Sequence, residues 1–407
     1  MKFRKVRLCD LCSIVTDYVA NGSFKTLADK VKYLNEGYAR VIRLVDYNNK
    51  YSKKDSIWVS KESYEFLKKS KLYGGEIVLT NVGANLGTVF IAPQLEYPTT
   101  LGPNAIMIKT NENDKYLYYW LKSKNGQNTI KSIVTGSAMP KFNKTDLKNI
   151  EIAIPCIEDQ DKIVEILSKI DKKIELNNQT NDNLYEITNK LYEQLFVIER
   201  QDDWKEYNLQ ELMDISNGYS YTGKELVDTS VVGMATIKNF ERTGGFKEEG
   251  FKDIEPIKAK DIHYADKFDI LVACTDLTQN ADIIGNAIML LNIGKYEKVV
   301  ISMDLVKILP KKNKYLVFSI LNSKEFKNFA LGYKTGTTVL HLNKNCFKDF
   351  HIKLPDFDKI ENFEKVVETN YKKISYNLEE NNTLTQLRDT LLPKLMNGEI
   401  DLDKIEI

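Results

Sequence analysis

The chain has 407 residues, of which 43% are hydrophobic and 28% are charged. This is enough apolar material for two or three hydrophobic cores, so a single small domain is not expected. Lysine and arginine number 58 and aspartate and glutamate 57. The resulting net charge of +1 excludes a strong overall basic field but leaves local basic surfaces open.

The sequence argues against a membrane segment, a signal peptide and a disulfide framework. No apolar run approaches the roughly 18 residues that a membrane span requires. The basic start Met1–Lys5 is followed by Asp10 and Asp17, which interrupt any hydrophobic segment of a signal peptide. The five cysteines are an odd number spread along the chain, which argues against a disulfide framework. We therefore expect a cytoplasmic globular protein without a membrane segment.

Short β-branched and aromatic runs, bounded by Gly, Asn and Asp, predict strands and turns in both halves of the chain. In the first half we expect strands at Arg40–Val45, Ile77–Thr80, Thr88–Ala92, Ala105–Lys109 and Ile150–Ile154. Helices are expected around Lys115–Lys122 and, in the second half, Lys314–Asn322. Each half is thus predicted to be a mixed α+β domain of about 150 residues.

A long helical segment follows each half, and in both segments residues spaced alternately by three and four form a heptad seam. We assign its apolar members to a coiled coil or to a partner surface: Ile163, Leu167, Ile170, Ile174, Leu184, Leu191, Val367, Ile374, Leu384 and Leu391. Pro155 and Pro355 precede the helices. Pro393 predicts a kink or an early end of the second helix, and Asn397-Gly398 predicts its C-terminal cap.

One long repeat organises the whole chain. Residues 136–155 and 336–355 align at an offset of 200, and the strand-like segment 76–79 resembles 269–272. The identical pairs are Gly136/Gly336, Asn143/Asn343, Lys144/Lys344, Lys148/Lys348, Ile152/Ile352 and Pro155/Pro355. The repeat predicts a duplication with a domain at 1–155, a spacer helix at 156–200, a second domain at 201–355 and a second spacer helix at 356–407.

The connection between the helices predicts their direction. A helix from Ile163 to Ile198 would be roughly 54 Å long, whereas the domain that joins the two helices is only about 40 Å across. Antiparallel pairing is therefore predicted, with one domain at each end of the spacer. Four asparagines fall near the middle of the helices: Asn177, Asn181, Asn377 and Asn381. Either they are buried amides that set the register, or they face solvent or a partner.

Catalytic signatures are scarce. The segment Gly218–Glu225 comes close to a phosphate-binding P-loop, but Glu225 stands where a Ser or Thr would hold Mg²⁺. Cys9 and Cys12 lack a second pair of metal ligands, and the three histidines are scattered. We expect no catalytic residues and no metal site in this chain.

A duplicated α+β domain joined by long antiparallel helices resembles the specificity (S) subunit of type I restriction–modification enzymes. The segments that carry the resemblance are Ile154–Ile174 and Leu387–Ile400, which look like the conserved helical regions of that family. The second helix departs from the pattern, because Pro355-Asp356 leads into it without the Glu158-Asp159-Gln160 entry of the first.

The resemblance implies two target-recognition domains, each reading one half of a split site in double-stranded DNA. It also implies that the helices dock two methyltransferase (M) subunits, which carry S-adenosylmethionine, and possibly restriction (R) subunits, which use ATP and Mg²⁺. No cofactor is expected on this chain itself. A spacer of roughly 54 Å corresponds to about one and a half turns of B-DNA, which fits a bipartite target with a non-specific gap.

Candidate DNA contacts are polar loop residues that recur in both halves, because lysines and small hydroxyls suit phosphates and asparagine suits adenine edges. These are Ser137, Lys141, Asn143, Lys144, Thr337, His341, Asn343 and Lys344. Alternatively, Asn143-Lys144 caps or turns into the strand that follows.

Further candidates are arginines, which can fork onto guanine, and polar residues that follow matching strands. The arginines are Arg40, Arg43 and Arg242, for which surface salt bridges are the alternative. The loop residues are Asn81, Asn85, Thr275, Gln279 and Asn280, which are base readers or plain turn residues.

Three other functions remain open from the sequence. The chain could be an adaptor with two ligand domains on a coiled coil and no role in DNA binding. It could be a nucleotide hydrolase with its site at Gly218–Lys224. It could also be the specificity subunit of another restriction system, in which it serves a fused nuclease–methyltransferase.

Overall fold

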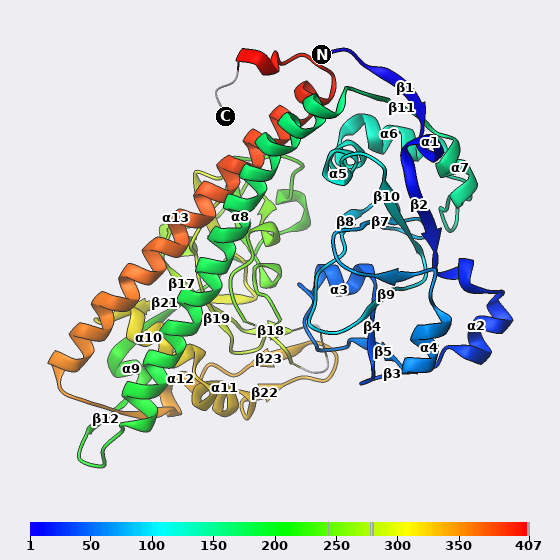
Figure 1. Cartoon of the computed structure of the whole chain (residues 1–407). Helices are drawn as coiled ribbons and strands as arrows, with labels where there is room; N and C mark the ends of the chain where they lie inside the picture. The colour runs from blue at the N-terminus through cyan, green and yellow to red at the C-terminus, as the bar shows by residue number, and fades with distance from the viewer. Residues whose placement is uncertain (243, 277, 279–280, 405–407) are drawn as a thin grey trace. The chain divides into compact units, whose positions relative to one another are not determined.

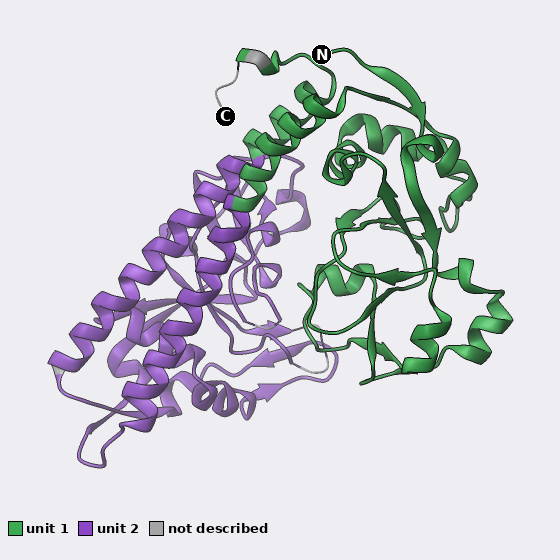
Figure 2. Cartoon of the chain, viewed as in Figure 1, with its two compact units in different colours: residues 1–172, 386–407 green, residues 173–385 purple. Residues whose placement is uncertain are grey.

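The computed structural model describes residues 1–242, 244–276, 278 and 281–404 (Figure 1). The chain divides into two compact units, one of Met1–Lys172 with Gln386–Ile407 and one of Lys173–Thr385 (Figure 2). Each unit combines a globular α+β domain with a part of each long helix. The duplicated α+β architecture predicted from the sequence is therefore confirmed.

The globular part of the first unit is centred on a four-stranded antiparallel sheet. The strand order is β2 (Cys12–Asp17), β10 (Ala105–Thr110), β7 (Ile77–Thr80) and β8 (Val89–Ile91). Helices α5 (Asp114–Lys122) and α6 (Lys124–Ser132) follow β10, and buried residues of α5 share a hydrophobic core with the sheet. The predicted strands and helix of this region thus match within one or two residues.

A second sheet of the first unit has five strands and its own small core. The strand order is β3 (Tyr33–Leu34), β5 (Ile57–Val59), β4 (Ala39–Ile42), β9 (Thr99–Leu101) and β6 (Lys71–Leu72). Strands β4 and β9 are parallel, and the other pairs are antiparallel. Three short helices lie between the strands in sequence: α2 (Phe24–Lys30), α3 (Leu44–Asn48) and α4 (Lys61–Phe66). The predicted strand Arg40–Val45 is shorter than expected, because α3 begins at Leu44.

The second unit repeats both sheets. Its first sheet runs β13 (Met213–Asn217), β21 (Leu305–Pro310), β17 (Ile270–Ala273) and β19 (Ala287–Met289). Its second sheet runs β15 (Lys252–Asp253), β14 (Val232–Ala235), β20 (Lys298–Ile301) and β16 (Tyr264–Ala265). Strands β14 and β20 are parallel, as β4 and β9 are. Helices α10 (Lys314–Asn322) and α11 (Lys324–Leu331) correspond to α5 and α6.

Each domain is closed by a pair of strands that joins its first and last segments. Strand β1 (Arg4–Arg7) pairs antiparallel with β11 (Glu151–Ile154). Strand β12 (Lys205–Asn208) pairs in the same way with β24 (His351–Leu354). Each long helix begins three residues after the last strand of its domain, so this pairing also brings the start of the domain close to the start of the helix.

The long helices are α8 (Ile157–Tyr192), which continues as a π-helical turn over Glu193–Ile198, and α13 (Phe357–Met396). The prediction that Pro393 ends α13 early is wrong. A proline in the last turn removes one backbone donor, and the carbonyl of Pro393 still accepts the N–H of Asn397 at 3.0 Å. Gly398 then ends the helix with φ +73°, which confirms the predicted cap.

Within the second unit, the two helices run antiparallel and pair through buried amides. Asn177 Nδ2 donates to Asn381 Oδ1 at 2.9 Å, and Asn377 Nδ2 donates to Asn181 Oδ1 at 2.7 Å. All four side chains are buried. The repeat offset of 200 converts one pair into the other, so these two layers lie symmetrically about the middle of the seam. The prediction that these amides are buried is confirmed over the solvent-facing alternative, and their role in setting the register stays a prediction.

Within the first unit, the start of α8 and the end of α13 are also antiparallel. Arg388 forms an ion pair with Asp171 at 2.9 Å, and Asp171 accepts a hydrogen bond from the Tyr119 hydroxyl at 2.7 Å. Ile163 and Leu167 of α8 share a core with Leu395 of α13. Among the described residues, none of the helices combines the length and the apolar composition that a membrane span requires.

Candidate nucleic-acid interface

An exposed hairpin projects from the first domain. Thr135 and Lys141 exchange two backbone hydrogen bonds of 2.8 and 2.9 Å, and Ser137 and Lys141 are exposed. Gly136 turns the chain with φ +85°, and a Cβ atom at this position would lie 2.9 Å from the carbonyl oxygen of Met139. The turn therefore requires glycine, and the sequence motif marks a defined hairpin.

The second domain carries the same hairpin. Strand β22 (Lys334–Thr335) pairs with β23 (Leu340–Leu342), and Thr335 lies opposite His341. Gly336 again has positive φ, at +94°, and has no room for a side chain beside the Val339 carbonyl oxygen. Thr337 and His341 are exposed. The repeat thus places two equivalent polar hairpins on the surface, one per domain.

The asparagines after the hairpins have a local structural role. Asn143 caps α7 (Lys144–Asn149): its Oδ1 accepts the N–H of Asp146 at 2.8 Å, and its Nδ2 donates to the carboxylate of Asp146 at 2.7 Å. Asn343 Oδ1 accepts the N–H of Asn345 at 3.0 Å. The capping alternative that the sequence left open is confirmed for Asn143.

The lysines beside them are anchored in equivalent ways. Lys144 Nζ lies 2.8 Å from Asp17 Oδ1 at the end of β2, and Lys344 Nζ donates to Asn217 Oδ1 at the end of β13. Both partners are related by the offset of 200. These lysines hold the segment after each hairpin against the central sheet, whereas the hairpins and the asparagines after them are exposed.

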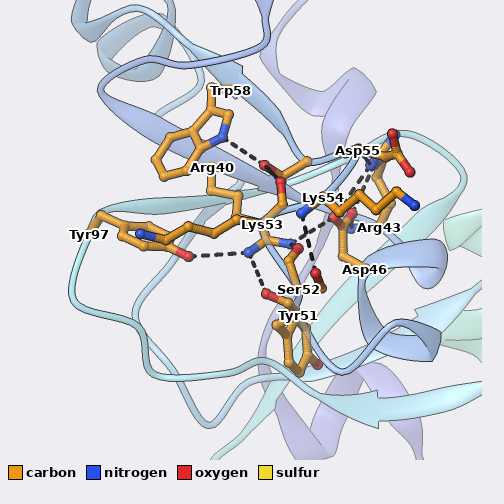
Figure 3. Close-up of polar contacts among 11 residues, drawn as sticks. Arg40, Arg43, Asp46, Tyr51, Ser52, Lys53, Lys54, Asp55, Trp58 and Tyr97 are labelled. Atoms are coloured by element: carbon orange, nitrogen blue, oxygen red, sulfur yellow. Dashed lines mark hydrogen bonds and ion pairs between the residues drawn. The ribbon is translucent and has the colours of Figure 1, made fainter. Parts of the chain in front are cut away.

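Arg40 is an interior residue, and the prediction that it forks onto guanine is wrong. Its side chain is 0% exposed and forms an ion pair with Asp46 at 3.1 Å (Figure 3). The guanidinium also donates to the carbonyl oxygens of Tyr51 and Ser52, both at 2.7 Å, and to the Tyr97 hydroxyl at 3.1 Å. The sequence could not reveal this, because the burial of a charged strand residue depends on its ion-pair partner in the fold.

Arg43 shares the same carboxylate. Its Nε lies 2.8 Å from Asp46 Oδ2, and it donates to the carbonyl oxygen of Asp55 at 3.0 Å (Figure 3). The Arg43 side chain is 24% exposed, so the salt-bridge alternative accounts for it. Arg242, in the second domain, is exposed and stays a candidate.

The residues that follow matching strands divide into two groups. Asn81 donates to the Phe142 carbonyl at 3.0 Å, and the Asn85 carbonyl accepts the Thr80 hydroxyl at 2.6 Å, so both support turns. Thr275 is buried in β18 (Thr275–Asp276), which pairs with β23 and removes it from any base contact. The predictions for Gln279 and Asn280 lie outside the described residues.

A polar clamp that the sequence reading missed recurs in the five-stranded sheet and its counterpart. Asp46 accepts the N–H of Arg43 at 3.0 Å after β4, and Asn239 accepts the N–H of Thr236 at 2.8 Å after β14. Both pairs are related by an offset of 193. The match of Ile77–Leu79 with Ile270–Val272 has this same offset and would have revealed the clamp.

The segment that resembles a P-loop is a carboxylate-centred turn. Residues Gly223–Glu225 form a single 3₁₀ turn with no long helix after it. Glu225 is buried and accepts hydrogen bonds from the Tyr219 hydroxyl and from the N–H groups of Thr222 and Ile257. Its carboxylate occupies the place where a P-loop would bind phosphate, so this segment does not support nucleotide hydrolysis.

This turn predicts an acid-sensitive contribution to stability. The Tyr219 hydroxyl and the two N–H donors lower the pKa of Glu225 to about 2. Because this pKa is below the unfolded value of about 4.3, the stabilisation is present above that value and is lost as the pH falls toward 2. We expect the stability difference between wild type and Glu225→Gln to narrow between about pH 5 and pH 2 in urea unfolding. A constant difference across that range would contradict this.

The helix pair shields its seam and exposes other apolar residues. None of the ten predicted seam residues is exposed. In the second unit, Leu176, Tyr376 and Ile187 are 49%, 58% and 53% exposed, and in the first unit Leu387 is 46% exposed. These form two repeat-related pairs, Leu176 with Tyr376 and Ile187 with Leu387. The seam is therefore helix core, and these two exposed pairs occupy equivalent positions on both helices. Val197, Ile198 and Val366 are also exposed but have no exposed apolar counterpart.

Comparison with known proteins gives one family. Residues 2–186 match the family model of the type I restriction modification DNA specificity domain. The type I restriction enzyme MjaIX specificity subunit of Methanocaldococcus jannaschii is 24% identical over 352 residues, which cover 81% of this chain and 79% of that protein. The MjaVIII specificity subunit of the same organism is 23% identical over 358 residues, with 80% and 79% coverage.

Over most of its length, this chain is thus similar to specificity subunits of type I restriction enzymes. The fold agrees: the type I restriction–modification S subunit from M. genitalium superposes with a TM-score of 0.56 at 16% identity, covering 97% of this chain and 96% of that one. The family model stops at residue 186, but the four-stranded sheet and the hairpin of the first domain recur in the second.

Proposed function

We propose that this chain is the DNA-recognition subunit of a type I restriction–modification complex and that it reads a bipartite target in double-stranded DNA. The observation that carries the proposal is the duplication itself. Each domain has the same sheets and the same exposed polar hairpin, at Gly136–Lys141 and Gly336–His341. Two similar readers with different hairpin sequences suit a target made of two different half-sites.

The proposal assigns the two readers to residues 1–155 and 201–355 and the spacer helices to 156–200 and 356–407. Phosphate contacts would position each domain on the duplex, and hairpin side chains would contact base edges. The residues predicted from the sequence that are exposed remain proposed contacts: Asn85, Ser137, Lys141, Asn143, Arg242, Thr337, His341 and Asn343.

The helices would dock two methyltransferase subunits. Exposed apolar side chains that recur on both helices, Leu176 with Tyr376 and Ile187 with Leu387, support two equivalent docking surfaces. The methyltransferase subunits would carry S-adenosylmethionine, and any restriction subunit would use ATP and Mg²⁺. Such a complex would act in the cytoplasm. The present chain would contribute recognition and assembly rather than catalysis.

Adenine methylation in the source strain, with and without this gene, tests the proposal. Loss of methylation at one split motif would establish the recognition role and give the target. If the locus is silent, the chain can be coexpressed with its methyltransferase subunits and assayed on a library of duplexes. A complex that methylates without sequence preference, or a chain that binds no methyltransferase subunit, would overturn the proposal.

Exchange of the hairpins tests where the first half-site is read. The variant S137T/A138T/M139V/P140L/K141H gives the first hairpin the sequence of the second and keeps Gly136. We expect methylation of the native target to fall roughly 10–100-fold, because each good base contact contributes about 1–3 kcal/mol of discrimination. Methylation rates on a library randomised in one half-site at a time would show preference changing in one half only. Unchanged preference in both halves would exclude base reading by this hairpin.

A further inference from the structure

We infer that the loop Asn49–Asp55 of the first domain is a phosphate-contacting element for the DNA backbone, and that Arg40 is the residue that positions it. This inference rests on the proposed function and adds to it a surface that the repeated hairpin does not include. The loop connects α3 to β5 in the five-stranded sheet. Its lysines were not among the residues predicted from the sequence.

The loop presents an exposed, mainly basic surface. Lys50, Lys53 and Lys54 are exposed, as are Asn49 and Ser52. The single acidic residue of the segment is Asp55, whose carbonyl oxygen is already bound by Arg43. Lysine is a flexible point charge that suits phosphate oxygens rather than the bidentate reading of a base. The chemistry therefore fits the backbone of a nucleic acid, in a chain whose overall charge is close to neutral.

The backbone of this loop is held in an unusual conformation. Lys50, Tyr51 and Asp55 have φ values of +49°, +57° and +60°, in the left-handed region that non-glycine residues rarely adopt. The buried Arg40 guanidinium binds the carbonyl oxygens of Tyr51 and Ser52, both at 2.7 Å (Figure 3). Such backbone strain persists where the surrounding structure holds it, and it is concentrated at functional sites.

The middle and the end of the loop are held by two arginines that share one carboxylate. Asp46 accepts the N–H of Arg43 at 3.0 Å and pairs with both arginines. Arg40 then reaches the middle of the loop, and Arg43 reaches its end at Asp55 (Figure 3). The lysines thus project from a preorganised backbone, which lowers the entropy cost of binding a phosphate.

The second domain clamps the equivalent connection in a similar way, although its residues 240–251 carry three glutamates against one arginine and one lysine. Asn239 is fully buried, accepts the N–H of Thr236 at 2.8 Å, and donates to the carbonyl oxygen of Lys247 at 2.9 Å. This connection, between β14 and β15, corresponds to that between β4 and β5. A held loop at the same place in both domains is what two readers of one continuous duplex would need.

The test uses the full chain assembled with its methyltransferase subunits. We compare wild type with Lys53→Ala/Lys54→Ala for binding to the target duplex and to an unrelated duplex over a range of KCl concentrations. If both lysines contact phosphates, the slope of log affinity against log salt should become less steep by about 1.8. At low salt the affinity should fall roughly tenfold for both duplexes, because phosphate contacts carry no sequence information.

A matched control is available in the same domain. Lys68 and Lys69 are also adjacent and exposed, and Lys68→Ala/Lys69→Ala removes the same charge. We expect its salt slope to equal that of wild type. An equal change in the affinity and salt slope of this control would show that overall charge alone causes the effect, and it would overturn the inference. A lysine-loop variant that binds DNA normally but loses its methyltransferase subunits would make the loop a protein-docking surface instead.

The two proposals can fail separately. Unchanged DNA affinity in Lys53→Ala/Lys54→Ala, with target preference intact, overturns the loop assignment and leaves the proposed function standing. Absence of target preference in the wild-type complex overturns the proposed function itself.

The positioning role of Arg40 has its own measurement. Arg40→Lys keeps the charge but cannot hold two carbonyl oxygens and a carboxylate with one planar group. We expect faster amide hydrogen exchange in residues 49–55 and a reduced DNA affinity that is not additive with the lysine pair. Additive losses, or unchanged exchange in the loop, would show that Arg40 does not act through it. The lysine variants test the surface even if the Arg40 variant does not fold.

Discussion

Replacing Arg40 with methionine should lower the free energy of unfolding of the five-stranded lobe by about 3–5 kcal/mol, the range for breaking a buried ion pair from one side. Methionine fills much of the volume but leaves the carboxylate of Asp46, which is 3% exposed, with one cation fewer. It also leaves the carbonyl oxygens of Tyr51 and Ser52 without their donor. The three left-handed residues of the loop would then lose the contacts that hold them.

Arg43→Met is the matched comparison, because Arg43 pairs with the same carboxylate but is partly solvated. A pair of this kind typically contributes up to about 1 kcal/mol, so its loss should be much smaller. Amide hydrogen exchange over residues 39–59 would measure both variants locally. The fluorescence of Trp58, whose indole N–H donates to Ser56 Oγ, gives an independent signal. Equal destabilisation by the two substitutions would contradict the assigned difference in burial.

The repeated elements of the fold were predictable because they follow local rules. The predicted strand at Ile77–Thr80 and the helix at Lys314–Asn322 match β7 and α10 at both ends. Alternation of side chains and turn residues determines such elements with little help from the rest of the chain. The antiparallel helix pair was also predictable, since the length of the connecting domain allows few other paths.

The failures concern residues whose role depends on a distant partner. Arg40 reads as an exposed arginine in the sequence, but Asp46, Tyr51 and Tyr97 together make it an interior residue. Pro393 reads as a helix terminator, but the helix continues to Met396 and the Pro393 carbonyl still accepts the N–H of Asn397. Neither burial nor position within the final turn is visible in a spacing pattern.

Only part of the candidate site was predicted from the sequence, because the offset between the two halves of the chain changes from 200 to 193. The hairpins at Gly136 and Gly336 were found because the offset of 200 holds there without insertions. The clamp at Asp46 and Asn239 was missed because an insertion shifts the offset to 193 and because the two side chains differ in charge. A repeat search that allowed both offsets would have placed these residues together.

The buried amides of the helix pair carry the second large prediction. Asn377 is 0% exposed, and its Nδ2 is the donor for the Oδ1 of Asn181. Asn377→Leu would leave that acceptor buried without its partner, and an unsatisfied buried polar group costs about 1–3 kcal/mol. We expect chemical denaturation of the full chain to show a loss of this size.

Asn181→Leu/Asn377→Leu should recover most of that loss, because removing both polar partners leaves an apolar layer with no unsatisfied group. The double-mutant cycle would then give a coupling energy of about 1 kcal/mol or more, because the double variant loses less stability than the two single variants together. Asn183→Leu is the control, because Asn183 is exposed on the same helix and takes no part in the two amide layers. It should cost less than either buried single substitution.

The cycle separates register specification from simple stabilisation. If the two amides contribute independently, the double substitution will cost the sum of the two single ones. If they instead select one register, matched Asn or matched Leu layers will be tolerated and mixed layers will not, since a mixed layer is what a shifted register would create. Because the offset of 200 converts Asn177–Asn381 into Asn377–Asn181, the same result is expected for Asn177→Leu and Asn177→Leu/Asn381→Leu. A different outcome at this second layer would show that the two layers are not equivalent.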